Sequence, residues 1–388
     1  MQQFDFETLA DAAPIDFGTP YHPEHTVLAG AQLHLKTAPC ILKALEQRVR
    51  SGLFGWTASD VPQYLDAVRG WMEQVRGWNI QRDWIVPSYG TLQAISAAIR
   101  AFTKQGDGII VQSPAYVLYD RVIRNTGRKK ICNPLIYENG CYRMDFDGLE
   151  TLMAKPENCL MILCNPHNPI MDYWEREDLK RVASLASRYG VLVVADEIFA
   201  EHVFADMPMT PYATLEEAMG NCIVCTSLGK SFNFTGTSHA NIIIPEEHLR
   251  ERYRRQRDED HYGSLSPFMY TAVLAAYTPQ GKAWIDALLA FVEENIRLVR
   301  EFFARYLPQA VICRHRAGSL IWVDLRACGT QEQIDRLFAK ANITVDDGSQ
   351  YGKEGEGFVR LQLGIPREEL TRTLSRLLNA GREIKMIA

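Results

Sequence analysis

The chain has 388 residues, of which 47% are hydrophobic and 23% are charged, with a formal net charge of −5. These values are typical of an ordinary soluble protein of two or three domains, or of one large domain with a smaller companion, and the mild acidity argues against nucleic acid or an anionic membrane as a partner. The sequence contains no apolar run long enough for a membrane span and no signal-peptide pattern at its start, so we expect a cytoplasmic protein.

The N-terminal third is expected to be an arm followed by two helices. Prolines and glycines interrupt residues 1–30, which predicts an arm or loop. Residues 38–50 have the apolar spacing of an amphipathic helix with a proline in its first turn. A glycine-broken loop over 51–56 and a second helix over about 61–78 follow.

From residue 84 to residue 244, short apolar strands alternate with helices. We expect helices over 92–102, 116–125 and 177–189, and strands over 108–112, 129–134, 159–164, 191–195, 223–225 and 240–244, with a further strand ending at Pro87. This alternation predicts an α/β fold with a mainly parallel sheet.

The pattern changes after Pro279. Residues 282–306 predict one long helix, and strands over 320–325 and 358–363 alternate with helices near 331–341 and 367–378. We therefore expect a second, smaller α+β domain. The predicted division is an N-terminal arm that is part of the small domain (1–45), a large domain (46–279) and a small C-terminal domain (280–388).

Nine cysteines are scattered along the chain. The one Cys-x-x-Cys pair, Cys222 and Cys225, lies in an apolar segment with no second pair and no histidine nearby. We therefore expect buried reduced thiols and no metal site, although zinc or redox use of this pair is an alternative.

Polar residues that follow predicted strands are the candidates for a ligand site, because ligands bind at strand ends in such sheets. Gly90 and Thr91 open a helix and suit a phosphate, although a plain helix cap is an alternative. Two Asn-Pro pairs over 165–169 form a rigid turn that can aim the Asn168 amide into a cleft. Asp196 ends an apolar strand, where a carboxylate is costly unless it is paired or caps a helix.

Lys230 follows the apolar segment 222–225 and is surrounded by small and aromatic residues. Burial lowers the pKa of an amine, and the common use of such a lysine is a Schiff base with a substrate carbonyl or with pyridoxal phosphate. A lysine that reaches from a strand end to solvent is the alternative for this residue by itself.

The order of these residues, with Pro114-Ala115-Tyr116 between the first two groups and Arg360 after Lys230, resembles the fold-type-I pyridoxal-phosphate enzymes of the aspartate aminotransferase superfamily. The resemblance extends from about residue 38 to 378. Within the superfamily the chain is most similar to the cystathionine β-lyase/maltose-regulon-modulator branch of C–S lyases. The motifs are Thr37-Ala38-Pro39, Gly52-Leu53-Phe54-Gly55, Asn165-Pro166-His167-Asn168-Pro169, Asp196-Glu197-Ile198, Lys230-Ser231-Phe232-Asn233 and Gly357-Phe358-Val359-Arg360-Leu361.

The resemblance implies a fold with a seven-stranded sheet in a large domain, pyridoxal 5′-phosphate as cofactor, a small amino-acid substrate and a homodimer. Lys230 would form the Schiff base and later move the Cα proton, and Asp196 would bind the pyridine nitrogen. The other implied roles are the phenolic oxygen for Asn168, ring stacking for Tyr116, the phosphate for Gly90, Thr91 and Ser227, and the substrate for Arg360 and Trp56. Arg360 would take the α-carboxylate as a bidentate pair.

The sequence departs from the branch at several of its positions, namely Met171 for glycine, Phe199 for a tyrosine or histidine, Gly229 for serine, Ser238 for an arginine of many aminotransferases, and Trp56 for a tyrosine. We expect the core chemistry to survive these changes. The function implied is α,β-elimination on cystathionine-like or S-conjugated cysteines, which gives a thiol, pyruvate and ammonia. An amino-acid aminotransferase is the alternative, since it uses the same residues, and a protein that binds and regulates a partner is a third possibility.

Overall fold

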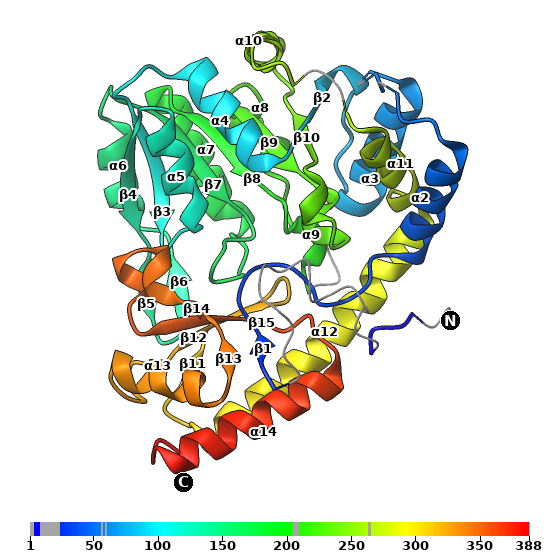
Figure 1. Ribbon diagram of the computed structural model, residues 1–388. Coiled ribbons are helices and arrows are strands. Elements are labelled where there is room, and N and C mark those ends of the chain that lie inside the picture. The colour runs from blue at the N-terminus through cyan, green and yellow to red at the C-terminus, as the bar shows by residue number, and fades with distance from the viewer. Residues whose placement is uncertain are drawn as a thin grey trace.

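The structure is a computed structural model that describes residues 4–7, 24–55, 57–58, 60–204, 209–262 and 265–387. Trp56 lies outside these ranges. A large sheet covered by helices forms the upper part of the molecule in Figure 1, and a smaller sheet with two helices lies below it. The long helix α12 (Pro279–Tyr306) extends along the lower side and connects the two parts of the chain.

The large sheet has seven strands in the order β2-β10-β9-β8-β7-β3-β4. All neighbours are parallel except β10, which is antiparallel to both β2 and β9. The three central strands β7, β8 and β9 are buried almost throughout, as their apolar sequences require. The bounds are Ile85–Ser88 (β2), Gly108–Ser113 (β3), Lys129–Pro134 (β4), Asn158–Cys164 (β7), Leu192–Asp196 (β8), Cys222–Thr226 (β9) and Ala240–Ile243 (β10). The predicted mainly parallel sheet is confirmed.

The predicted helices of this half are also present, with ends that follow ordinary capping rules. The helix α4 begins directly after Gly90, whose φ of +100° suits glycine. The helix α7 ends at Gly190 in the left-handed conformation. The bounds of the predicted helices are Pro39–Ser51 (α2), Pro62–Arg76 (α3), Thr91–Phe102 (α4), Val117–Asn125 (α5) and Arg176–Tyr189 (α7). The short helices Glu216–Met219 (α8) and Leu228–Ser231 (α9) were not predicted.

The lower part contains a four-stranded antiparallel sheet in the order β11-β12-β15-β14. The strand β1 (Thr26–Val27) pairs with β13 (Ile343–Thr344), so the prediction of an irregular arm over residues 1–30 is wrong at these two positions. The remaining bounds are Val311–Ile312 (β11), Leu320–Asp324 (β12), Asp346–Asp347 (β14), Phe358–Gln362 (β15), Gln331–Lys340 (α13) and Arg367–Glu383 (α14).

The sequence prediction missed several elements, among them the hairpin of β5 (Ile136–Glu138) and β6 (Cys141–Arg143), the short strands β11, β13 and β14, and the helices α6 (Phe146–Met153), α10 (Glu247–Glu259) and α11 (Pro267–Ala276). In α10 the structure buries only Arg250 and Tyr253, so there is no apolar stripe to detect. The helix α11 has the opposite character, because it is apolar on nearly all sides.

None of the described helices is long and apolar enough to cross a membrane. Likewise, the described part of the chain contains no group of three His, Cys, Asp or Glu side chains that could hold a metal ion. All nine cysteines lie in the described ranges and are free thiols. Cys222 and Cys225 are buried as expected, whereas the expectation of burial is wrong for Cys132 and Cys141, which are exposed.

Candidate active site

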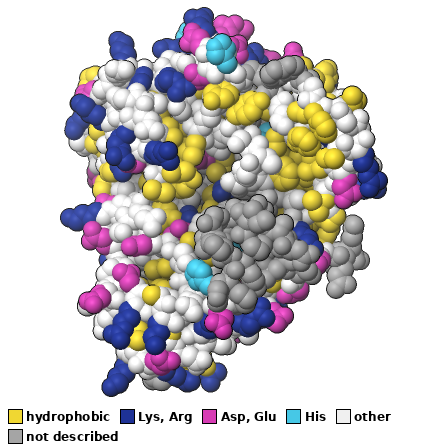
Figure 2. Space-filling view, viewed as in Figure 1, with side chains coloured by type: hydrophobic (Ala, Val, Ile, Leu, Met, Phe, Trp, Pro, Cys, Tyr) yellow, Lys and Arg dark blue, Asp and Glu magenta, His cyan; other side chains and the backbone are white. Residues whose placement is uncertain are grey.

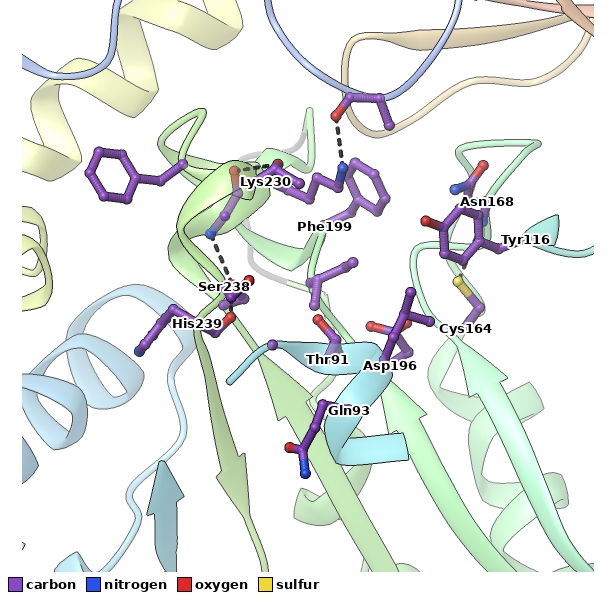
Figure 3. A pocket seen from close by; sticks show the side chains of 18 of the residues that line it. Thr91, Gln93, Tyr116, Cys164, Asn168, Asp196, Phe199, Lys230, Ser238 and His239 are labelled. Atoms are coloured by element: carbon purple, nitrogen blue, oxygen red, sulfur yellow. Dashed lines mark hydrogen bonds between the residues drawn. The ribbon is translucent and has the colours of Figure 1, made fainter. Parts of the chain in front are cut away.

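A cavity of about 220 Å³ lies at the carboxyl ends of the central strands, where α4 begins. Figure 3 shows Asp196 and Thr91 at its base, Lys230 and Phe199 on one side, and Asn168 and Tyr116 on the other. The segments that meet here are far apart in the sequence, and strand ends of a parallel sheet are the usual place for a ligand. The cavity is lined by Ala31, Tyr89, Gly90, Thr91, Leu92, Gln93, Tyr116, Tyr119, Cys164, Asn168, Asp196, Ile198, Phe199, Ser227, Gly229, Lys230, Phe234, Thr235, Ser238 and His239.

Asp196 is the last residue of β8 and only 3% of its surface is exposed. One carboxylate oxygen, Oδ2, accepts a hydrogen bond from the Tyr119 hydroxyl at 2.6 Å. The other oxygen, Oδ1, is buried and has no partner among the described residues. Burial raises the pKa of Asp196 to about 6, and the bond from Tyr119 partly opposes this effect. A buried carboxylate oxygen without a donor is costly, so the site favours a ligand that brings an N–H group.

Lys230 lies in α9 and its Nζ donates to the backbone carbonyl of Ala31 at 2.8 Å. Burial and the positive charge of Arg360 lower the pKa of the Lys230 amine to about 8, while Asp196 opposes the shift. The neutral, nucleophilic form of the amine is therefore present in an appreciable fraction near neutral pH. The ring centre of Phe199 lies 5.9 Å from Nζ.

The start of α4 offers free backbone N–H groups to the cavity, since the first turn of a helix has no internal acceptors for them. Gly90 and Thr91 lie at this position as predicted. Ser227 lies across the cavity, but its hydroxyl donates to the carbonyl of His239 at 2.6 Å and accepts from the Gly229 N–H at 2.9 Å. The Ser227 hydroxyl would have to rotate before it could donate to an anion.

Asn168 and Arg360 form a connected pair beside the cavity. Nη1 of Arg360 donates to Oδ1 of Asn168 at 2.7 Å, which leaves the Asn168 NH₂ group as the end that can donate to a ligand. Arg360 lies in β15 and is 3% exposed. It does not line the cavity directly but lies behind Asn168, and it also contacts Asp346.

The ring of Tyr116, a predicted cofactor residue, lines the cavity and meets the ring of Tyr119 edge-on at 5.4 Å. Four of the positions where the sequence departs from the branch lie in or next to this site, and Gly229 is one that lines the cavity. Phe199 lines the cavity without a polar atom on its ring, and Ser238 lines it near His239. Met171 lies behind Phe199 in a small apolar cluster, with a left-handed backbone φ of 52°.

The structure thus brings together Lys230 and the six other predicted cofactor residues, with Arg360 adjacent, whereas Trp56 lies outside the described residues. Sequence analysis missed Tyr119 and Asp346. Tyr119 follows Tyr116 by three positions on a helix, and this spacing could have indicated it. Asp346 had no such signal, because it reaches Arg360 only through strand pairing.

Comparisons with known proteins agree with this geometry. Residues 26–377 match the family "Aminotransferase class I and II". The chain is 35% identical to "Cystathionine beta-lyase PatB" of Bacillus subtilis over 89% of this chain and 90% of that protein. It is 30% identical to "Protein MalY" of Escherichia coli, with 92% and 91% covered.

Among solved structures, cystalysin from Treponema denticola, which contains a pyridoxal 5′-phosphate cofactor, superimposes with a TM-score of 0.92. The two chains are 28% identical, and the superposition covers 98% of this chain and 99% of cystalysin. The resemblance found in the sequence motifs and the expected fold are therefore confirmed. The chain belongs to the aminotransferase class I and II family.

Proposed function

We propose that this protein is a pyridoxal-phosphate-dependent C–S β-lyase that acts on cystathionine-like or S-conjugated cysteine substrates. The observation that carries the proposal is the pair formed by the reactive Lys230 amine and the unpaired, buried Oδ1 of Asp196 in one cavity. The choice of a lyase over an aminotransferase rests on the 35% identity to a protein named cystathionine β-lyase.

The residues present fit pyridoxal 5′-phosphate. Oδ1 of Asp196 lacks a donor, and a protonated pyridine nitrogen would supply one. The NH₂ group of Asn168 can donate to a phenolic oxygen, and the N–H groups at the start of α4 with Gly90, Thr91 and Ser227 suit a phosphate. When bound, the cofactor supplies an electron sink for the negative charge that develops at the substrate Cα.

Each protein group then has one task. Lys230 would hold the cofactor through Nζ, and the neutral Nζ would take the Cα proton of the substrate, a role that its pKa of about 8 suits. Asp196, as a carboxylate, would keep the ring nitrogen protonated. Tyr119 holds Oδ2 of Asp196 and so fixes the direction of Oδ1.

The substrate is oriented by Arg360, which binds the α-carboxylate, while Asn168 connects Arg360 to the cofactor side of the cavity. Loss of the Cα proton places a pair of electrons next to the Cβ–S bond. This bond breaks and the thiolate leaves with the electron pair. Addition of water to the remaining three-carbon unit gives pyruvate and ammonia, so one substrate and one water yield a thiol, pyruvate and ammonium.

The test is pyruvate release by the purified holoenzyme from L-cystathionine without an amino-group acceptor. Many pyruvates per active site support β-elimination. At most one keto acid per site, with conversion of the cofactor to its amine form, supports an aminotransferase and contradicts the lyase.

We also propose a homodimer. The face formed by α2, the loop after it and α11 presents exposed apolar side chains, with Phe54 stacked on Phe268 at 5.5 Å. Figure 2 shows hydrophobic side chains gathered over α2, α3 and α11. This face includes Leu42, Val49, Leu53, Phe54 and Phe268, and such a patch marks an interaction surface. Trp56 comes next after Gly55 in the sequence and would contribute to a substrate site. Light scattering tests the dimer.

We also propose a cytoplasmic protein with a large and a small domain. The nine free thiols suit the cytoplasm, a reducing compartment. Residues 46–279 contain the large sheet and 280–388 the four-stranded sheet, in support of a large and a small domain, with residues 1–45 joined to the latter through β1. The boundary at residue 45 falls inside α2, and limited proteolysis tests the division.

A further inference from the structure

Arg360 contacts a carboxylate that belongs to the chain itself. Oδ2 of Asp346 accepts hydrogen bonds from Nε of Arg360 at 3.0 Å and from Nη2 at 2.5 Å. The two residues are direct partners across the antiparallel strands β14 and β15. Their side chains are only 4% and 15% exposed, for Arg360 and Asp346 respectively. The pair is therefore shielded from solvent, where a charge interaction is strong.

The hydrogen bonds of Arg360 use three of its N–H groups. A guanidinium has five N–H groups. Asp346 takes the edge formed by Nε and Nη2, and Asn168 accepts from Nη1 at 2.7 Å. One N–H therefore remains on each of the two terminal nitrogens, and a pair of such N–H groups can bind a carboxylate through both of its oxygens.

The same carboxylate oxygen also holds the segment that covers the lysine. Oδ2 of Asp346 accepts from the backbone N–H of Gly30 at 2.9 Å. The next residue, Ala31, lines the cavity and its carbonyl accepts from Nζ of Lys230 at 2.8 Å. Asp346 therefore contacts both Arg360, the proposed carboxylate-binding residue, and the segment at Gly30 and Ala31, which contacts Lys230.

We propose that Asp346 is a positioning residue for Arg360 that also sets how tightly the site holds a carboxylate; the proposal rests on the function assigned to Arg360 above. Asp346 turns the two remaining N–H groups of the guanidinium to the substrate. Its negative charge shares the same guanidinium with the substrate carboxylate, and the two like charges oppose each other. Arg360 consequently binds carboxylates more weakly than a buried arginine without an acidic partner would. Weaker binding also favours release of pyruvate.

The test compares two ligands that differ only in the carboxylate, L-alanine and ethylamine. Their dissociation constants are measured on the holoenzyme from the change in cofactor absorbance, and the ratio of the ethylamine constant to the L-alanine constant isolates the contribution of the carboxylate. In Asp346→Asn the amide oxygen still accepts hydrogen bonds but the opposing charge is gone, so we expect this ratio to rise about tenfold. Asp346→Ser, with a small hydroxyl acceptor, is the second variant if the first does not fold.

The matched control is Asp347→Asn, the same change at the next residue of β14. The Asp347 carboxylate accepts from the backbone N–H of Ser349 at 2.8 Å, so its loss should leave the ratio at the wild-type value. An unchanged or smaller ratio in the Asp346 variants overturns the inference.

A third variant separates this inference from the proposed function. Arg360→Lys should reduce the ratio of the ethylamine to the L-alanine dissociation constant, because lysine has no planar pair of N–H groups for bidentate binding of a carboxylate. If Arg360→Lys reduces the ratio while the Asp346 variants do not raise it, the role of Asp346 alone is wrong. If Arg360→Lys leaves the ratio unchanged, the carboxylate is not held by Arg360, and both the inference and that part of the proposed function are overturned.

Discussion

The two sides of the cavity are built in different ways. On the sheet side, Asp196 and Ser227 each lie within one residue of the end of a buried parallel strand, and Lys230 follows within four. The other side, which we call the clamp side, contains Arg360, the proposed carboxylate-binding residue. Arg360 contacts Asn168 and Asp346 from two separate segments, and Asp346 also binds Gly30. The sheet side is therefore fixed by local chain geometry, whereas the clamp side depends on how the lower part of the molecule packs against the upper one. Substitutions on the two sides should differ in what they abolish.

The largest effect should come from Lys230→Ala, on the sheet side. Because the variant has neither the Schiff-base amine nor the base for the Cα proton, we expect pyruvate release to fall by about a thousandfold or more. The absorbance of the lysine-bound cofactor should be lost while the thermal unfolding midpoint stays near that of the wild-type protein. A variant that released pyruvate at the wild-type rate would exclude Lys230 from the chemistry.

Asp196→Asn should lower activity by about a hundredfold, because an amide does not keep the ring nitrogen protonated. The same change should stabilise the apoprotein at high pH. The folded pKa of Asp196 is raised from 3.8 to about 6 by burial, so the stability that this group contributes is present at low pH and is lost as pH rises through about 6.

At about 1.4 kcal/mol per pKa unit, the gain for the asparagine apoprotein at pH 8 is at most about 3 kcal/mol. Urea unfolding of both apoproteins at pH 5 and pH 8 measures it. Asp347→Asn, at a position outside the cavity, serves as the control. If the free energy of unfolding of the asparagine variant, relative to the wild-type apoprotein, did not increase from pH 5 to pH 8, ionised Asp196 would not destabilise the apoprotein.

The contrast between the two sides also explains what the sequence could predict. The alternation of strands and helices placed Asp196, Asn168 and Lys230 at strand ends, and parallel strands bring such residues to one edge. Their identities then matched the motifs of a known superfamily. Gly90 and Thr91 were found in the same way, from a short loop before a helix.

The residues that were missed depend on contacts between distant segments. Asp346 is 14 positions from Arg360 and reaches it through a two-residue strand, which leaves no periodic pattern. The helix α10 was missed for a different reason, because its solvated surface carries charges where an amphipathic pattern would have apolar residues. Tertiary packing, not local propensity, determines these elements.

On the clamp side, Arg360→Ala should lower kcat/KM by about a hundredfold, since a buried charge pair and the contact to the substrate carboxylate are lost together. The cofactor absorbance should remain, because the residues that contact the cofactor are unchanged. The expected separation is thus a loss of substrate binding with retention of the lysine-bound cofactor, in contrast to Lys230→Ala. Unchanged kinetics would remove Arg360 from the substrate site.

The smallest effect should come from Tyr119→Phe, which removes the hydrogen bond from the Tyr119 hydroxyl to Oδ2 of Asp196 and keeps the ring. That bond lowers the pKa of Asp196, so its loss should raise this pKa further above about 6. Protonated Asp196 has no negative charge to keep the ring nitrogen protonated, and the acidic limb of the pH profile of kcat/KM should consequently move to higher pH. We expect a loss of about threefold to tenfold at pH 7 that is largely recovered at pH 8.5, in line with one hydrogen bond to a charged group.

The control is Tyr116→Phe, which makes the same change three residues earlier and leaves the hydrogen bond from Tyr119 to Asp196 in place. The acidic limb of its pH profile should therefore not move. An equal loss of activity at pH 7 and pH 8.5 in Tyr119→Phe would mean that Tyr119 acts through packing and not through the ionisation of Asp196. The geometry of the sheet side would then be determined by the strands alone.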